Sequence, residues 1–482
     1  MLIDWASIGR GETECFDATL VELRGWFIPI GTGPVNYGAL VAEPGCCGSD
    51  VMLRPAATVE VFLERSIDGG LARMLTLAGR WAQGAGVTDG WHFQLRDAGV
   101  VDAGVSSQRR RLFMGAAAAA TMVACSAGRF REYTDSAQAL PARAAAAPTP
   151  KKGVTIDVHS HAGRVILSRQ ESVANSRPFL PLAGPMRDGG MNVACLAIVA
   201  DTTTMHVAAD GLRFEPYRAP APGELYEHAQ AAFARCAALI EQQGLHVVED
   251  AAALRAAPTR GPSVIIASEG ADFLEGRIER VEEAWRNHRL RHLQLTHYRV
   301  NELGDIQTEP PVHGGLTDFG AEVIERCNGL GIVVDVAHGP YDLVKRAASV
   351  TTRPLVLSHT SLTARPGPRS RQISAQHARL VADTGGIVGV WPNAAIFASL
   401  DAMAHGTRQL ADLIGVDHVA LGSDMLGFIS TPVFNSYRQL PAYASALLDA
   451  GFGTSDVEKI LGGNYLRVFE AVLAGHEGPS RS

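Results

Sequence analysis

The chain has 482 residues, more than a single hydrophobic core usually holds, so two domains or one large barrel with an extra module are expected. With 46% hydrophobic and 19% charged residues, its composition is that of a globular protein and excludes a disordered or fibrous one. A net charge of −7 gives no reason to expect a nucleic-acid partner. Seven cysteines without a Cys-x-x-Cys pair predict neither a zinc knuckle nor a disulfide framework.

Residues 1–105 consist of short β-strand patterns separated by glycine and proline. The expected strands are 18–23, 37–42, 58–62, 74–77 and 91–95. They predict a small all-β module, for which a barrel of the OB kind is one candidate. No pattern in this module indicates a chemistry, so the sequence leaves its function open.

Residues 106–152 contain a segment that resembles a twin-arginine export signal, followed by a linker. Arg110 and Arg111 precede a short alanine-rich run, which ends in a lipobox-like sequence at Cys125. The run is shorter than the roughly 20 residues that a membrane-spanning helix needs. The signal predicts a periplasmic or membrane-anchored protein, with a lipid anchor at Cys125. Residues 126–152, rich in Ala, Pro, Ser and Thr, predict a flexible linker.

The internal position of this segment leaves its role open, because export signals belong at the N-terminus and this one follows 105 residues. A downstream start, a fusion of two reading units and a linker helix in a cytoplasmic protein are the alternatives. The sequence does not choose among them.

Residues 153–482 alternate short apolar runs with helical patterns, for example at 224–243 and in a closing helix at 455–474. Near-continuous apolar strands are buried on both faces, as in a parallel sheet. Eight of them predict an α/β fold, a (β/α)8 barrel of the TIM type, with an insertion at about 200–250 covering its mouth. The runs are 154–158, 193–199, 263–267, 290–295, 331–336, 354–357, 387–391 and 418–421.

Two histidines, His159 and His161, stand one residue apart at the end of the first run. Positions i and i+2 of an extended strand point to the same side, so both imidazoles can face one point. Their spacing alone favours a metal site no more than a pair of surface histidines. Asp157 is expected to orient one imidazole by accepting its second N–H.

Histidine or acidic residues follow six of the eight runs, at the carboxyl ends where barrels of this type place their active sites. Each residue alone is more often a surface or packing residue, but together they predict one site. Five nitrogen and oxygen donors exceed a single tetrahedral site and favour two divalent ions, zinc being the expected one, that share Glu269. Asp335 is expected to support a ligand histidine. The strand-end residues are His159, His161, Glu269, His297, His338, His359 and Asp424.

Residues 153–474 resemble the membrane (renal-type) dipeptidase family of amidohydrolase-like barrels, because several separate motifs occur in the same order. The resemblance implies a metal-dependent dipeptidase that hydrolyses the peptide bond of dipeptides with a metal-bridged hydroxide. The motifs are DVHSH (157–161), SEGADF (268–273), LTHYRVNELGD (295–305), GIVVDVAH (331–338), PLVLSHT (354–360), RQIS (371–374), HVALGSDM (418–425) and ILGGNYLRVF (460–469).

The resemblance also implies a role for each matching residue. It assigns His297 to the scissile carbonyl, Arg371 to the carboxylate of the substrate and Asp424 to the catalytic proton. Arg371 lies in an arginine-rich stretch, so a solvated basic loop is the alternative for it. A homodimer is a further expectation. The implied metal ligands are His159, His161 and Glu269 for one ion, and Glu269, His338 and His359 for the other.

One position departs from the family pattern, because the better-known members have His-x-Asp where this chain has His159-x-His161. A neutral imidazole in place of a carboxylate removes one negative ligand charge. This should increase the Lewis acidity of the bound ion and alter the metal preference of the site. Two other functions stay open. One is another binuclear amidohydrolase-type hydrolase acting on a lactam, D-aminoacyl or ester substrate, although such enzymes often bridge their metals with a lysine and residues 153–344 contain none. The other is a non-catalytic exported binding protein.

Overall fold

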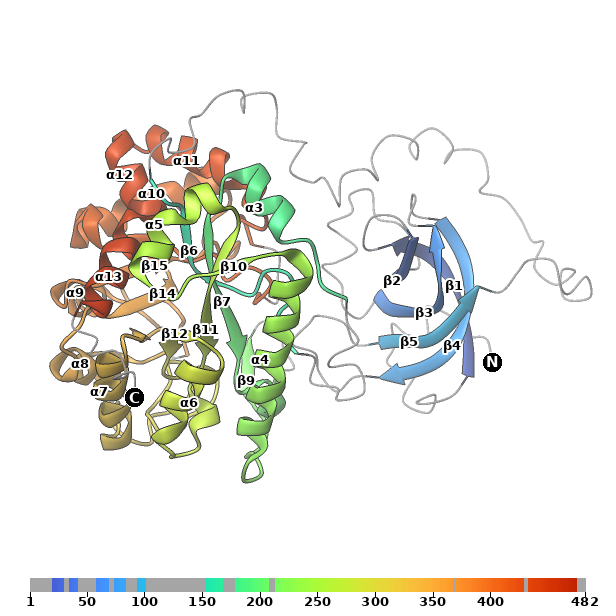
Figure 1. Cartoon of the computed structure of the whole chain (residues 1–482), viewed down its shortest axis with the longest axis horizontal. Helices are drawn as coiled ribbons and strands as arrows, with labels where there is room; N and C mark the ends of the chain where they lie inside the picture. Colours follow the sequence, from blue (N-terminus) through green and yellow to red (C-terminus); the bar gives the residue numbers. More distant parts are fainter. Residues whose placement is uncertain are drawn as a thin grey trace, which may run out of the picture. The chain divides into compact units, whose positions relative to one another are not determined.

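The computed structural model describes residues 20–29, 34–41, 58–68, 73–83, 93–100, 153–167, 178–207, 213–367, 369–428 and 432–474 (Figure 1). The chain forms two compact units, Met1–Pro141 and Ala142–Ser482. The predicted export signal, its lipobox cysteine and the linker up to residue 152 lie outside the described residues.

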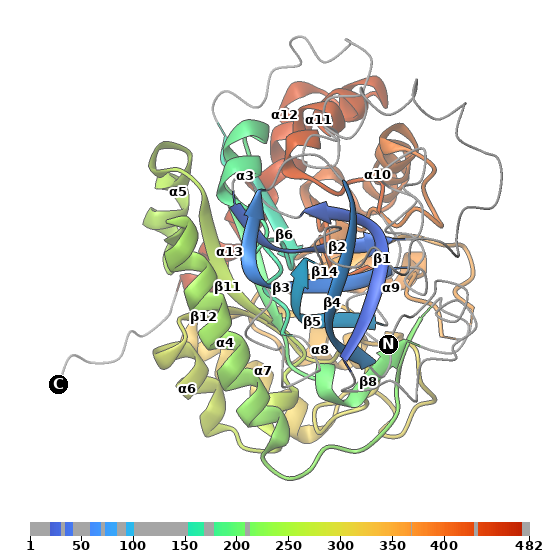
Figure 2. The ribbon, with the colours of Figure 1, turned by 90° about the vertical axis from the view of Figure 1, so that its right-hand side faces the viewer.

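The first unit contains a closed five-stranded barrel in the order β1-β2-β3-β5-β4, in which β1 also pairs with β4 (Figure 2). The β3–β5 pair is parallel and the other pairs are antiparallel. Trp81, Phe27 and Leu23 are among the side chains that fill its core. The prediction of a small all-β module is confirmed, although its strands are longer than expected. They are β1 (Leu20–Pro29), β2 (Pro34–Val41), β3 (Thr58–Asp68), β4 (Arg73–Gln83) and β5 (Phe93–Val100).

The second unit is a parallel eight-stranded barrel, which confirms the predicted (β/α)8 fold. The sheet closes between its first and last strands through backbone hydrogen bonds, from Asp424 N to His159 O and from His161 N to Met425 O, both 2.9 Å long. All eight predicted runs are strands. They are β6 (Ile156–Ser160), β7 (Val193–Val199), β11 (Ser263–Glu269), β12 (Leu290–Gln294), β13 (Val333–Asp335), β14 (Val356–Thr360), β15 (Ile387–Val390) and β16 (Val419–Leu421).

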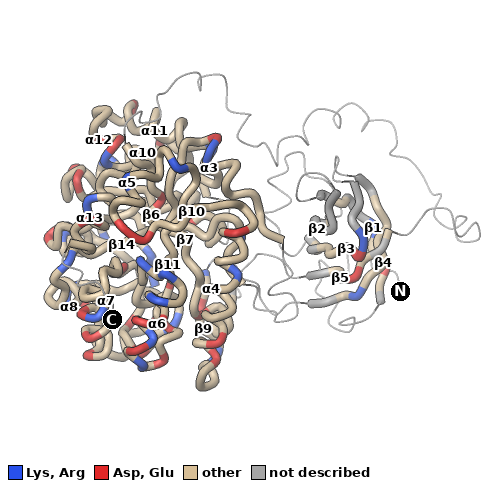
Figure 3. The backbone as a smooth tube through the Cα atoms, viewed as in Figure 1, with Lys and Arg blue, Asp and Glu red and all other residues tan. Residues whose placement is uncertain are grey.

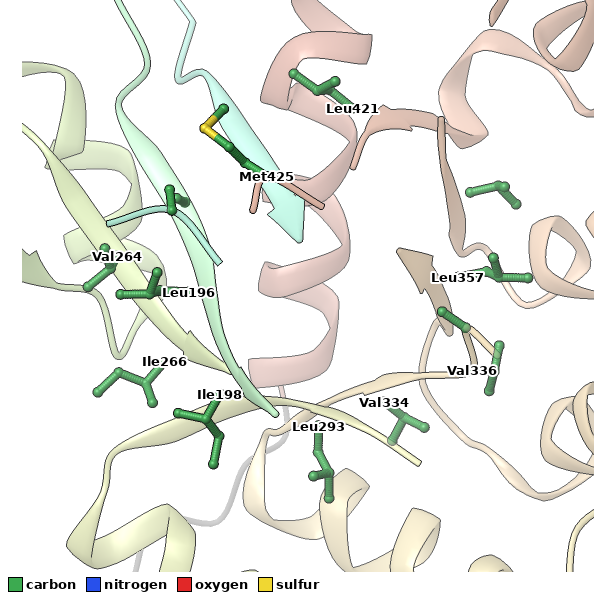
Figure 4. Close-up of a cluster of buried hydrophobic side chains, with 14 of the residues drawn as sticks. Leu196, Ile198, Val264, Ile266, Leu293, Val334, Val336, Leu357, Leu421 and Met425 are labelled. Carbon is green, nitrogen blue, oxygen red and sulfur yellow. The ribbon is translucent and has the colours of Figure 1, made fainter. Parts of the chain in front are cut away.

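Both faces of these strands are buried, as the continuous apolar runs predict. On β7, Cys195 and Ala197 belong to one buried cluster, which also contains Tyr465. Their neighbours Leu196 and Ile198 belong to a second cluster with the helices outside the barrel (Figure 4). This alternation assigns each strand-end side chain to one of the two faces.

Helices surround the strands (Figures 1 and 2). Figure 3 shows acidic and basic residues interspersed over them, and on α6 Glu282 pairs with Arg286 at 2.5 Å. None of the described helices is long and apolar enough to cross a membrane. The helices of eight or more residues are α4 (Glu224–Gln243), α5 (Ala251–Arg260), α6 (Glu279–Asn287), α7 (Asp318–Leu330), α8 (Tyr341–Val350), α9 (Ala375–Asp383), α10 (Leu400–Ile414), α11 (Leu440–Asp449) and α13 (Asn464–Leu473).

The insertion after β7 contains the hairpin β8 (Met205–Val207) and β9 (Phe214–Pro216), helix α4 and the short strand β10 (His246–Val247). The aromatic ring of Phe214 on this hairpin lies 5.3 Å from that of Tyr298, which follows β12. The insertion therefore reaches the carboxyl-terminal end of the barrel, as expected.

The expectation of one continuous closing helix is wrong. The segment is divided into α12 (Thr454–Glu458), a π-helical turn (Lys459–Gly463) and α13. The break occurs at Gly462, whose backbone leaves the helical conformation where a Cβ atom would lie only 2.0 Å from the carbonyl oxygen of Val154. The close approach of this segment to the start of β6 requires a glycine here and interrupts the helix.

Candidate metal centre and active site

The two histidines at the end of β6 face each other as predicted, with their Nε2 atoms 3.3 Å apart. Both side chains are buried. The Nδ1 atom of His161 lies 2.8 Å from the carbonyl oxygen of Ala197, which can only accept a hydrogen bond. His161 therefore carries a proton on Nδ1, and when the ring is neutral its Nε2 lone pair is available to a metal ion.

Glu269, the last residue of β11, lies at the centre of the site. Its Oε1 atom is 3.1 Å from Nε2 of His338, and its Oε2 atom is 3.1 Å from Nε2 of His161. Burial raises the pKa of this carboxyl group, but the surrounding imidazoles, His297 and His159 foremost, hold it well below its usual range. Glu269 is therefore an anion whose two oxygens face two separate groups of histidines.

His338 and His359 form the second group, with their Nε2 atoms 3.1 Å apart. Burial lowers the pKa of both rings well below the usual value, so both are neutral. Neutral imidazole is the form that binds metal ions. The backbone of His338 is left-handed, with φ of 66°, and this turn after β13 directs its ring toward Glu269.

The donor atoms have the spacing of a metal site. Neighbouring ligands of a tetrahedral zinc ion lie roughly 3.3 Å apart when each bond is about 2.0–2.1 Å long. Glu269 Oε1 lies 3.1 Å from His338 Nε2 and 3.4 Å from His359 Nε2, and the two nitrogens are themselves 3.1 Å apart. Nitrogen lone pairs at this distance repel each other unless a cation lies between them, so the residues fit divalent ions.

His297 also reaches the centre, with Nε2 3.2 Å from Glu269 Oε2. Its other ring nitrogen, Nδ1, lies 2.6 Å from Oδ1 of Asp201, a fully buried residue two positions beyond β7. Asp201 is not among the residues predicted from the sequence. The available signal was an acidic residue after the second apolar run, in the position that the other site residues occupy after theirs.

Asp424 follows β16 and lies beside the first pair of histidines, with Oδ1 3.3 Å from His161 Nε2 and 4.0 Å from His159 Nε2. Its Oδ2 atom accepts a hydrogen bond of 3.1 Å from the indole N–H of Trp391. Trp391, one residue beyond β15, is a second site residue that was not predicted from the sequence. With Asp201 and Trp391 included, all eight strand ends contribute to the site.

Arg371 belongs to the site and not to a solvated loop. Its guanidinium group donates to Oε1 of Gln307 at 2.5 Å and lies 3.1 Å from Nε2 of His359. Within the described part of the chain it forms no ion pair with a carboxylate, and burial lowers its pKa. The neighbouring Arg365 and Arg369 are exposed. The site thus has a half-buried cation available for an anionic group.

The expected roles of Asp157 and Asp335 are wrong. Asp157 accepts hydrogen bonds from the backbone N–H of Ser423 and the hydroxyl of Tyr437, both at 2.8 Å, and from no imidazole of the described residues. The expectation rested on the position of Asp157 just before the two histidines in the sequence, which does not determine the partners of its side chain. Asp335 contacts Nε2 of His292 at 3.2 Å instead of a ligand histidine. Both carboxylates connect neighbouring strands beneath the site.

The family model "Membrane dipeptidase (Peptidase family M19)" matches residues 185–478. The chain belongs to the membrane dipeptidase family. The matched residues contain Glu269, His297, His338, His359, Arg371 and Asp424, and they begin after the His159-x-His161 motif, where this member departs from the family pattern.

Two curated relatives illustrate the sequence similarity. Dipeptidase aclJ of Aspergillus oryzae is 32% identical over 188 residues, which are 37% of this chain and 44% of the relative. An uncharacterized protein in the pqqA 5' region of Klebsiella pneumoniae is 31% identical over 178 residues, which are 35% of this chain and 65% of that protein. The aligned part thus spans about half the length of these relatives.

Solved structures share the barrel fold of this dipeptidase-family member. A metallopeptidase from Rhodobacter sphaeroides, liganded with a phosphinate mimic of the dipeptide L-Ala-D-Ala, is 21% identical with a TM-score of 0.58 and covers 67% of this chain and 99% of its own. The probable dipeptidase PvdM from Pseudomonas aeruginosa is 15% identical with a TM-score of 0.55 and covers 67% and 96%. At these identities the likeness concerns the fold.

Proposed function

We propose that this protein is a metal-dependent dipeptidase that hydrolyses the peptide bond of dipeptides. The observation that carries the proposal is the position of Glu269 between two pairs of histidines, with the guanidinium group of Arg371 beside one pair. Membership of the membrane dipeptidase family supports it.

The site is proposed to hold two divalent ions, zinc in the first place, because imidazole and carboxylate ligands suit that ion. His159, His161 and Glu269 would hold the first ion, and Glu269, His338 and His359 would hold the second. When bound, the ions supply positive charge that lowers the pKa of a water molecule and polarises a carbonyl group.

His297 is proposed to donate a hydrogen bond from Nε2 to the carbonyl oxygen of the scissile bond. Because Nδ1 faces the carboxylate of Asp201, the ring can donate from both nitrogens only when it is protonated. Burial opposes the charged form, but Asp201 and Glu269 raise the pKa of His297. A well-placed donor of this kind contributes about 2.7–4 kcal/mol of transition-state stabilisation.

Asp424 is proposed to take the proton of the attacking water and to deliver it to the leaving amine. Its carboxylate lies at the first histidine pair, and the Trp391 indole holds one of its oxygens. Arg371 is proposed to bind the C-terminal carboxylate of the substrate with its planar guanidinium group. An arginine at a fixed distance from the reacting centre selects for length and favours dipeptides over longer peptides.

Export by the 106–125 segment to the periplasm or to a membrane, a lipid anchor at Cys125 and a homodimer belong to the same proposal, with a cytoplasmic protein as the alternative. They rest on the export-like sequence and on the resemblance to the family.

The test is hydrolysis by the purified full chain of a panel of L-L and L-D dipeptides, with tripeptides and dipeptide amides as controls. A lactam and an ester are included because His161 departs from the family pattern. We expect cleavage of dipeptides that disappears after chelation and returns when zinc is added. Metal-bound protein that cleaves the lactam or the ester but no dipeptide would overturn the proposal.

A further inference from the structure

We infer that Trp391 selects the C-terminal residue of the dipeptide by its size, admitting glycine and alanine and excluding bulky side chains. The inference rests on the proposed dipeptidase function and deepens it by naming a residue that determines specificity. Trp391 lies outside the motifs that resemble the family, so the resemblance implies no role for it.

The proposed roles of Asp424 and Arg371 define where the C-terminal residue of the substrate lies. Asp424 delivers a proton to the nitrogen of this residue as the peptide bond breaks, and Arg371 binds its carboxylate. Only the α-carbon separates these two groups in an amino acid. The α-carbon and its side chain therefore lie between Asp424 and Arg371.

Trp391 lies beside both of these residues. Its indole N–H donates to Oδ2 of Asp424 at 3.1 Å, and Cζ of Arg371 lies over the indole ring, 5.8 Å from its centroid. The ring centroid of His359, a proposed ligand of the second ion, is 6.4 Å from that of the indole. Trp391 is half-buried, so part of its surface remains open to a substrate. The indole therefore forms a wall along the space in which the side chain of the C-terminal residue has to fit.

Several contacts fix the indole in this position. Phe428 stacks on it, with ring centroids 4.9 Å apart and an interplanar angle of 20°. The backbone N–H of Trp391 donates to the carbonyl oxygen of Thr360 at 2.8 Å, and the following residue, Pro392, favours an extended backbone at Trp391. The indole cannot rotate away from a larger substrate without losing the stacked ring and the hydrogen bond to Asp424.

The size of this fixed side chain decides which residues fit beside it. A hydrogen atom or a methyl group on the α-carbon leaves the indole in place, whereas a branched or aromatic side chain would overlap it. Because Phe428 and Arg371 already lie over the ring, the indole limits the space more than it offers a surface for stacking. One methylene group more or less in an apolar pocket changes kcat/KM by roughly 10–200-fold, so a wall of this size is sufficient for strong selection.

The test measures kcat/KM of the zinc-loaded full chain for alanyl dipeptides that end in glycine, alanine, leucine or phenylalanine, the last three in both the L and the D configuration. In the configuration that is cleaved faster, the wild type should prefer alanine over phenylalanine by roughly 10-fold or more. Trp391→Ala should reduce this preference by roughly 10-fold or more, because it removes the wall. Dipeptides that vary at the N-terminal residue and end in alanine are the matched control, and Trp391→Ala should leave the preference among them unchanged.

A second variant separates the size of the side chain from its hydrogen bond. Trp391→Phe keeps a ring but removes the indole N–H that holds Oδ2 of Asp424. It should lower kcat for all the dipeptides alike, by roughly 10–100-fold, and should relax the preference for small C-terminal residues less than Trp391→Ala does. Bound zinc is measured in each variant to show that the site is intact, and Trp391→Leu replaces Trp391→Ala if that variant does not fold.

Two results would overturn the inference and leave the proposed function standing. One is a preference for small C-terminal residues that is the same in Trp391→Ala as in the wild type. The other is a wild type that prefers phenylalanine at the C-terminal position and loses this preference in Trp391→Ala, which would make the indole a binding surface and not a limit. A wild type that binds zinc but cleaves no dipeptide would instead overturn the proposed function, and this inference with it.

Discussion

Oδ1 of Asp201 lies 2.6 Å from Nδ1 of His297, and its Oδ2 accepts the backbone N–H of Tyr298 at 3.0 Å. The carboxylate thus fixes both the ring of His297 and the chain segment that follows it. Asp201 comes from β7 and His297 from the end of β12, two strands that are not adjacent in the sheet. This contact keeps Nε2 of His297 directed at Glu269 and at the position proposed for the substrate carbonyl.

Asp201→Asn should lower kcat/KM for a dipeptide by roughly 10–100-fold, because the amide no longer stabilises the charged ring of His297. The amount of bound zinc should not change, since the side chain of Asp201 contacts His297 and Tyr298, which are not proposed metal ligands. Combining it with His297→Ala should cost little more than His297→Ala alone, because both act through one ring. Losses that multiply in the double variant would show that Asp201 acts elsewhere.

Arg371→Ala should raise KM for dipeptides more than it lowers kcat, and should narrow the preference for dipeptides over dipeptide amides. The reason is that the half-buried guanidinium, which has no carboxylate partner among the described residues, is the proposed site of the substrate carboxylate. Steady-state kinetics with a free dipeptide and its amide measure both effects. Arg365→Ala, in the exposed part of the same loop, is the control and should change neither value. If the ratio of kcat/KM for the dipeptide to kcat/KM for its amide is the same in Arg371→Ala as in the wild type, Arg371 does not bind the substrate carboxylate.

His377 on α9 should make the barrel less stable in mild acid. Burial, with Arg371 adding to it, lowers the pKa of His377 from 6.5 to about 4, and its Nε2 atom has no hydrogen-bond partner among the described residues. Between pH 6.5 and pH 4 the imidazole of His377 is protonated in the unfolded chain but neutral in the folded protein. The free energy of unfolding therefore has its full value above pH 6.5 and falls by about 3 kcal/mol as the pH decreases to 4.

His377→Leu should reduce this loss, as measured by urea unfolding at pH 7 and pH 4.5. His405→Leu, at an exposed position, is the control and should follow the wild type. Equal losses in the wild type and His377→Leu would mean that His377 is already protonated in the folded protein.

Removal of the metal should destabilise the barrel. If the proposed zinc ions bind the folded site and not the unfolded chain, free zinc at 100 times the Kd of one site adds about 2.7 kcal/mol to the free energy of unfolding. Differential scanning calorimetry of the full chain should show a transition that moves to lower temperature after chelation and returns with zinc. A Glu269→Gln variant should show a smaller shift. A transition that does not move when the measured zinc is lost would contradict this prediction.

The fold could be predicted from the sequence because burial on both faces leaves a simple pattern. Each of the eight apolar runs became a strand, and helix α4 has the predicted bounds. The break at Gly462 could not be predicted, since it depends on contact with the carbonyl oxygen of Val154, about 300 positions earlier in the chain.

The site could be predicted where a residue type marks the end of a strand, as for Glu269 and His359. The partners of Asp157, Asp335 and Asp201 could not, because they depend on register and on which strands face each other across the barrel. Asp157 contacts Ser423 and Tyr437, which lie more than 250 positions away in the sequence. Asp201 became recognisable only when the structure placed it against His297.

The central claim is that Glu269 bridges two divalent ions. The most direct measurement is a crystal structure of the zinc-loaded full chain with anomalous differences recorded at the zinc absorption edge. We predict two peaks, one within about 2.0–2.2 Å of each oxygen of Glu269, the first beside His159 and His161 and the second beside His338 and His359. A single peak, or two peaks with Glu269 bound to only one of them, would contradict it.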